Sequence, residues 1–190
     1  MEMAQLMKAG KQLIYVDESM FYSTLTCDRV WVYRGMTLSK PKDKYSCSVI
    51  GAISDKQGLL HYQILTTYND KVSFSTFISE LVHKVKGEAY VYMDNATVHT
   101  TGKVQEHFNE GVQARYLPKY SCALNPIERL WHLTKARWKK LMVEQPNLIN
   151  NKDDLVREVN KVIESYRHEC QQLASCHLEQ MVDVLKGKFV

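Results

Sequence analysis

The spacing of apolar residues changes near residue 70, and this change limits the chain to folds that combine a sheet with helices. Before it, short runs rich in β-branched and aromatic residues predict strands at 11–16, 30–33, 45–53 and 59–66. A turn-forming stretch at 54–58 joins the last two runs and predicts a hairpin. Beyond residue 70 the apolar residues follow helical spacing over 73–86, and Gly87 is placed to end that helix.

The rest of the chain alternates between strand and helix. Strands are expected at 89–93 and 113–117, and helices at 100–109, 125–143, 153–166 and 170–186. This order favours an α/β fold, a mixed sheet with helices on both faces. It is similar to the ribonuclease H-like order of three antiparallel strands followed by alternating helices and strands. The expected organisation is a lead-in at 1–10, a ribonuclease H-like domain at 11–143 and a C-terminal helical extension at 144–190.

Composition narrows the class of protein. A chain of 190 residues with 45% hydrophobic and 24% charged residues fits one globular domain. No apolar run is long enough to span a bilayer, so no membrane association is expected. Five cysteines at irregular spacing favour a reducing, intracellular compartment over a disulfide framework. Cys170, Cys176 and His177 lack a second ligand pair, which disfavours structural zinc. The net charge of +4 is compatible with nucleic acid but does not establish it.

Two apolar strands are expected to end in aspartate, at Asp17 and at Asp94. In the ribonuclease H-like order these strands lie side by side, so both carboxylates can face one site. Divalent cations that act on phosphodiesters prefer oxygen ligands of this kind. The alternative interpretation is that each aspartate is a turn residue or a helix cap. Glu18 should point to the opposite sheet face and is left out of the site.

A third carboxylate, Glu128, follows Asn125 at the start of the 125–143 helix, with Pro126 in its first turn. Two interpretations remain open for it. Asn125 and Glu128 stand at the spacing of a capping box, which would make Glu128 structural. Alternatively, Glu128 completes a group of three metal-binding carboxylates with the two aspartates.

Three segments resemble the catalytic blocks of the mariner superfamily of DDE transposases, which includes a bacterial insertion-sequence branch. They are VDES at 16–19, MDNATVH at 93–99 and LPKYSCALNPIERLW at 117–131. The third block is long and specific, and the spacing from Asp94 to Glu128 lies in the narrow range of that superfamily. The resemblance runs from about residue 11 to residue 140.

The resemblance implies a metal-dependent DNA transposase in which Asp17, Asp94 and Glu128 hold two Mg²⁺ or Mn²⁺ ions. In the family's reaction, water attacks a phosphodiester at the element's end and the freed 3′-hydroxyl then attacks target DNA. The implied partners are transposon ends and target DNA, with a homodimer in the active complex. Asn95 and His99 match the second block and are candidates for active-site support, by touching a phosphate or orienting a carboxylate. His99 could instead be a local helix-cap partner, and Trp131 a core residue.

Four basic residues crowd the helix that carries Glu128: Lys135, Arg137, Lys139 and Lys140. They are candidates for contacts with the DNA backbone, because cationic side chains neutralise phosphates. The alternative is an ordinary solvated helix face.

Family members carry an N-terminal helix-turn-helix region, whereas only residues 1–10 precede the first expected strand. The chain is therefore expected to be a fragment, to work with a separate helix-turn-helix half, or to have lost that module. Its location is expected to be the nucleus in a eukaryote and the cytoplasm in a bacterium. Two other functions remain open, a structure-selective nuclease with the same metal site and a non-catalytic DNA-binding subunit derived from a transposase. Strand transfer separates the transposase from the nuclease.

Overall fold

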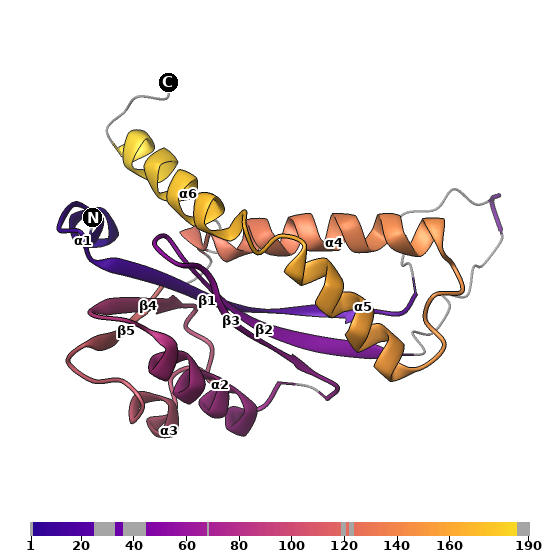
Figure 1. Cartoon of the computed structure of the whole chain (residues 1–190), viewed down its shortest axis with the longest axis horizontal. Helices are drawn as coiled ribbons and strands as arrows, with labels where there is room; N and C mark the ends of the chain where they lie inside the picture. The colour runs from indigo at the N-terminus through magenta and orange to yellow at the C-terminus, as the bar shows by residue number, and fades with distance from the viewer. Residues whose placement is uncertain are drawn as a thin grey trace.

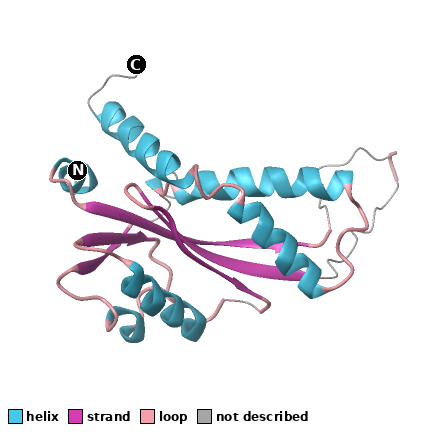
Figure 2. Cartoon of the chain, viewed as in Figure 1, coloured by secondary structure: helices cyan, strands magenta, loops and turns pink. Residues whose placement is uncertain are grey.

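A five-stranded mixed sheet forms the centre of the fold (Figures 1 and 2). The computed structural model describes residues 2–24, 33–35, 45–67, 69–118, 121 and 124–185. The strands are β1 (Gln12–Tyr22), β2 (Ser46–Ser54), β3 (Gly58–Leu65), β4 (Ala89–Met93) and β5 (Val112–Tyr116). Their order is β3-β2-β1-β4-β5, with the first three antiparallel and β4 and β5 parallel to β1. The predicted ribonuclease H-like arrangement, including its hairpin, is confirmed.

Helices cover both faces of this sheet, and Figure 1 shows them as separate layers. One face carries α2 (Lys71–Lys84) and α3 (Gly102–Gln105). The other carries α1 (Glu2–Lys8), α4 (Ile127–Glu144), α5 (Lys152–Glu164) and α6 (Cys170–Leu185). Buried side chains of α5 and α6, among them Leu155 and Ala174, belong to the same core cluster as α4 and the sheet. None of the described helices is both long and apolar enough to cross a membrane.

Alternation along β1 divides its side chains between the two layers. Leu13 and Tyr15 pack in the core beneath α4, whereas Ile14 and Val16 pack in the core beneath α2. Successive strand residues point to opposite faces. Asp17 therefore belongs to the α4 face and Glu18 to the α2 face.

The prediction that the first strand ends at Asp17 is wrong. β1 continues for five residues beyond it and pairs with β2 throughout, from Ile14 opposite Ser54 to Tyr22 opposite Ser46. The Asp-Glu-Ser sequence has a low intrinsic preference for strands, but the antiparallel ladder with β2 outweighs it. Asp94, in contrast, directly follows the last residue of β4, as expected.

One further local prediction needs correction. The helix expected over 100–109 is confined to Gly102–Gln105, and Asn109 Oδ1 instead accepts hydrogen bonds from the backbone of Gly111 and Val112. Asn side chains commonly compete with helices in this way. Residues 1–10, expected only as a lead-in, contain the seven-residue helix α1. Of the strand expected at 30–33, residues 30–32 lie outside the described residues.

Candidate active site

Asp17 is held in the middle of β1 by a tryptophan from α4. The Trp131 Nε1 donates a hydrogen bond to Asp17 Oδ2 at 3.1 Å, and the indole is only 2% exposed. Gly51 stands opposite Asp17 in the ladder, and a Cβ there would lie 2.7 Å from Trp131 Cη2. The glycine thus makes room for the indole to lie across β2 and reach the carboxylate. Trp131 is a core residue, as one interpretation held, and it also positions Asp17.

The other predicted carboxylates influence the acidity of Asp17. Burial and, after it, the negative charges of Glu128, Glu18 and Asp94 together raise the pKa of Asp17 from 3.8 to about 7, against a backbone hydrogen bond that lowers it. Neighbouring carboxylates disfavour each other's ionised forms. Residues remote in sequence therefore act on one acidic group.

Glu128 lies exposed in the first turn of α4. The capping-box interpretation is wrong, because Asn125 does not cap the helix: Pro126 occupies the N-cap position and makes no side-chain cap hydrogen bond. Asn125 is buried, and its Nδ2 donates to the backbone carbonyl of Val16 at 3.2 Å. This contact fastens the start of α4 to the strand residue directly before Asp17.

Asp94 is exposed, and a buried histidine binds it. His99 Nδ1 lies 2.6 Å from Asp94 Oδ1, while its Nε2 lies 2.8 Å from Glu18 Oε1. Burial lowers the pKa of His99, but the hydrogen bond to Glu18 and the charges of Glu18 and Asp94 outweigh it, so the pKa is raised. His99 thus contacts a carboxylate, as one of its predicted roles required. Asn95, beside it, is exposed.

Glu18 is the residue that the sequence interpretation missed. It does point to the opposite sheet face from Asp17, as expected, yet it reaches Asp94 through His99. The alternation of side chains along β1 predicted the sheet face on which Glu18 lies. No sequence signal indicated that the segment after β4 places a histidine over that face.

The acidic groups suit a hard divalent cation, because Mg²⁺ and Mn²⁺ take oxygen ligands. The carboxylates of Glu128, Glu18 and Asp94 contribute, after burial, to the raised pKa of Asp17, and a cation would offset their repulsion. Within the described part of the chain, however, no three His, Cys, Asp or Glu side chains are gathered closely enough to hold an ion.

The basic residues of α4 do not share one face. At 3.6 residues per turn, Lys135 and Lys139 lie within about 20° of Glu128 around the helix axis, whereas Arg137 lies about 180° away. Lys135 and Lys139 line a cavity of about 180 Å³ beside the end of β1. Lys140 lies 3.7 Å from Glu144. Only two of the four predicted DNA contacts therefore lie on the flank of α4 that carries Glu128.

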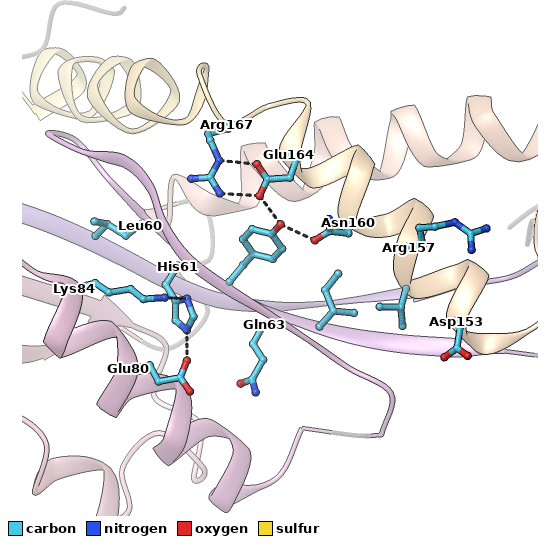
Figure 3. Close-up of a pocket in the computed structure, with 13 residues that line it drawn as sticks. Leu60, His61, Gln63, Glu80, Lys84, Asp153, Arg157, Asn160, Glu164 and Arg167 are labelled. Carbon is cyan, nitrogen blue, oxygen red and sulfur yellow. Dashed lines mark hydrogen bonds and ion pairs between the residues drawn. The ribbon is translucent and has the colours of Figure 1, made fainter.

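A larger cavity of about 760 Å³ lies elsewhere, along β3 between α2 and α5 (Figure 3). Several of its charged side chains are paired with each other. His61 lies 2.9 Å from Glu80, and Arg167 lies 2.6 Å from Glu164. None of the predicted carboxylates lines this cavity, so we place the candidate active site at Asp17 and not here.

Comparison with known proteins decides the family. The sequence profile of the DDE superfamily endonucleases matches residues 12–149. The chain belongs to this family. Membership confirms the resemblance drawn from the three sequence blocks, and it places Asp17, Asp94 and Glu128 inside the matched part of this DDE endonuclease domain. No curated protein sequence matches the chain.

Solved structures show the same fold for this DDE endonuclease domain. The catalytic domain of Mos1 mariner transposase superposes with a TM-score of 0.61 at 10% identity, covering 94% of this chain and 84% of that one. The Mos1 mariner paired-end complex with Mn superposes with a TM-score of 0.64 at 13% identity, covering 94% of this chain. The match spans 57% of the Mos1 chain in that complex. The Mos1 strand transfer complex gives a TM-score of 0.54 at 12% identity, covering 92% of this chain and 60% of that one.

Proposed function

We propose that this DDE endonuclease domain is the catalytic domain of a DNA transposase, which cleaves DNA strands and transfers the 3′-hydroxyl ends to target DNA. Asp17, Asp94 and Glu128 are the proposed catalytic, metal-binding residues. The observation that carries the proposal is the effect of Glu128 and Asp94 on the acidity of Asp17. Carboxylates at the end of β4 and at the start of α4 both contribute to the raised pKa of Asp17 on β1, and family membership supports the assignment.

Two Mg²⁺ or Mn²⁺ ions, when bound, would activate the attacking hydroxyl and stabilise the leaving oxygen of the phosphodiester. Residues of the chain hold the proposed metal ligands in position. Trp131 holds Asp17 through its indole N–H, and Asn125 keeps the first turn of α4 beside β1. Burial of Asp17 excludes water from one side of its carboxylate, which strengthens its interaction with any bound cation.

We further propose that the DNA backbone follows the flank of α4 that carries Lys135 and Lys139. Seven and eleven residues separate them from Glu128, so they stand roughly 10 and 16 Å along the helix from that carboxylate. Both side chains are exposed. Phosphates held there would lead a strand toward the acidic group. Arg137 lies on the opposite flank of α4 and is not proposed to contact this strand.

The proposed partners are transposon ends and target DNA, with two copies of the chain in the active complex and, where needed, a separate helix-turn-helix half. The support is similarity in fold to Mos1, whose structures include a complex with the left transposon end and a strand transfer complex. Complexes of Mos1 with Mn and with Mg support the choice of cation.

A joining assay tests the proposal. It would offer a pre-cleaved transposon end with a 3′-hydroxyl, a plasmid target and Mn²⁺ to the wild-type chain and to Asp94→Asn. That substitution keeps the shape of the side chain and removes its charge, so a folded but inactive protein is expected. Nicking without joining would identify the structure-selective nuclease instead. DNA binding with neither activity would identify the non-catalytic subunit, and joining by Asp94→Asn at the wild-type rate would refute the carboxylate assignment.

A further inference from the structure

We propose that Glu18 and His99 form a positioning pair for Asp94, so that strand β1 orients both aspartates of the candidate active site. The inference rests on the proposed function of the carboxylates and adds two residues that act through Asp94. The observation is a continuous chain of contacts. Glu18 Oε1 lies 2.8 Å from His99 Nε2, and His99 Nδ1 lies 2.6 Å from Asp94 Oδ1.

Asp94 needs such a support because the sheet no longer holds it. It follows the last residue of β4, and its side chain is 59% exposed. Two contacts hold one of its oxygens: Oδ1 lies 2.6 Å from His99 Nδ1, which also lies 3.2 Å from the Asp94 backbone carbonyl, and Oδ1 accepts from the Ala96 backbone N–H at 3.0 Å. No described residue donates to Oδ2. The arrangement fixes the carboxylate by one oxygen and leaves the other to a ligand.

His99 itself is held on all sides. It is 1% exposed, and its ring stacks on Phe74 of α2 with the centroids 4.1 Å apart. The Tyr116 hydroxyl donates to the His99 carbonyl at 3.1 Å. The buried imidazole cannot adopt another rotamer without losing its stacking on Phe74, so its nitrogens stay in place relative to Asp94.

Glu18 connects this histidine to the sheet. It lies in the interior of β1 opposite Ile50, and Asn69 Nδ2 donates to its Oε1 at 2.7 Å. Asp17 and Glu18 are adjacent, so alternation sends the first toward α4 and the second toward α2. One strand therefore positions Asp17 directly and Asp94 through His99. Residues in such outer contacts to metal ligands typically change metal affinity or activity by about 10–100-fold when removed.

The test compares Glu18→Ala and His99→Ala with a matched control in the same chain. Glu80 and His61 form a similar carboxylate–histidine pair at 2.9 Å, with His61 stacked on Phe77 of α2, and this pair lies at the β3 cavity (Figure 3). Mn²⁺ affinity, measured by titration of the thermal midpoint, and strand joining are recorded for each variant. A merely structural role would lower the metal-free midpoint alone.

We expect Glu18→Ala and His99→Ala to weaken Mn²⁺ binding by about 10–100-fold, with joining largely restored at saturating Mn²⁺. Glu80→Ala should leave Mn²⁺ affinity unchanged. Glu18→Gln, which retains an acceptor oxygen, should lie between Glu18→Ala and wild type, and it decides the question should Glu18→Ala fail to fold. The positioning role would be overturned if the Glu18 and His99 variants bound Mn²⁺ as tightly as Glu80→Ala does. Wild-type Mn²⁺ affinity in Asp94→Asn would instead overturn the proposed function.

Discussion

Replacing Gly51 with alanine should disturb the candidate active site from the neighbouring strand β2, on the same face of the sheet as Asp17. The new Cβ would lie 2.7 Å from Trp131 Cη2 and 3.0 Å from its Cζ2, against about 3.5–4.0 Å for a favourable carbon–carbon contact. The indole is 2% exposed and packed in the core, so it cannot move aside freely. Overpacking of this kind costs about 1–3 kcal/mol. For a domain of this size the melting temperature should fall by roughly 2–12 °C.

Thermal and urea denaturation would measure this cost. Gly102→Ala is the matched control, because a Cβ at Gly102 meets nothing within 4 Å. It should be neutral or raise stability by about 0.4–1 kcal/mol through the unfolded chain. In a Trp131→Phe background, where the ring is smaller, Gly51→Ala should cost less than in wild type. Gly51→Ala should also weaken Mn²⁺ binding, because the displaced indole no longer holds Asp17.

The steric argument would be refuted by a Gly51→Ala variant as stable as wild type. An equal cost of Gly51→Ala in the Trp131→Phe background would also refute it, because the two substitutions would then be independent.

Two other predictions concern charge. The pKa of Asp17 is raised from 3.8 to about 7 in the folded chain, so the folded state binds more protons than the unfolded one between these values. Without metal, the free energy of unfolding should therefore fall as the pH rises through this window. Asp17→Asn should flatten this pH dependence, as should saturating Mn²⁺ in the wild type. Identical pH dependences for wild type and Asp17→Asn would contradict the raised pKa of Asp17. Replacing Lys135 and Lys139 with alanine should make the salt dependence of DNA binding shallower by up to about 0.9 per lost phosphate contact. Replacing Arg137 and Lys140 should change it less, and equal effects of the two pairs would favour a solvated helix without a preferred flank.

Local patterns were sufficient for most of the elements. The hairpin of β2 and β3, the helix α2 and the strand β4 follow from turn residues and from the two periodicities of side chains, which depend only on neighbours in sequence. The position of Asp94 at a strand end follows in the same way. The three sequence blocks led to the DDE family without any structure, because motif and spacing are properties of the chain itself.

Interactions between distant segments explain what the sequence interpretation missed. Asn125 looked like a helix cap because capping is a local pattern, yet its amide binds the carbonyl of Val16. β1 extends past Asp17 because β2 pairs with it from Ile14 to Tyr22. Neither partner is close in sequence, so no local rule could select it.

The sequence alone determined the family, through its three blocks, and the faces of β1 on which Asp17 and Glu18 lie, since alternation in a strand follows from backbone geometry. Only the tertiary structure decided what those side chains meet. The segment after β4 folds over the α2 face and places His99 between Glu18 and Asp94, and α4 places Trp131 on Asp17 in the space that Gly51 leaves. These contacts depend on how separate elements pack, because packing sets the distances between residues that the chain itself holds far apart.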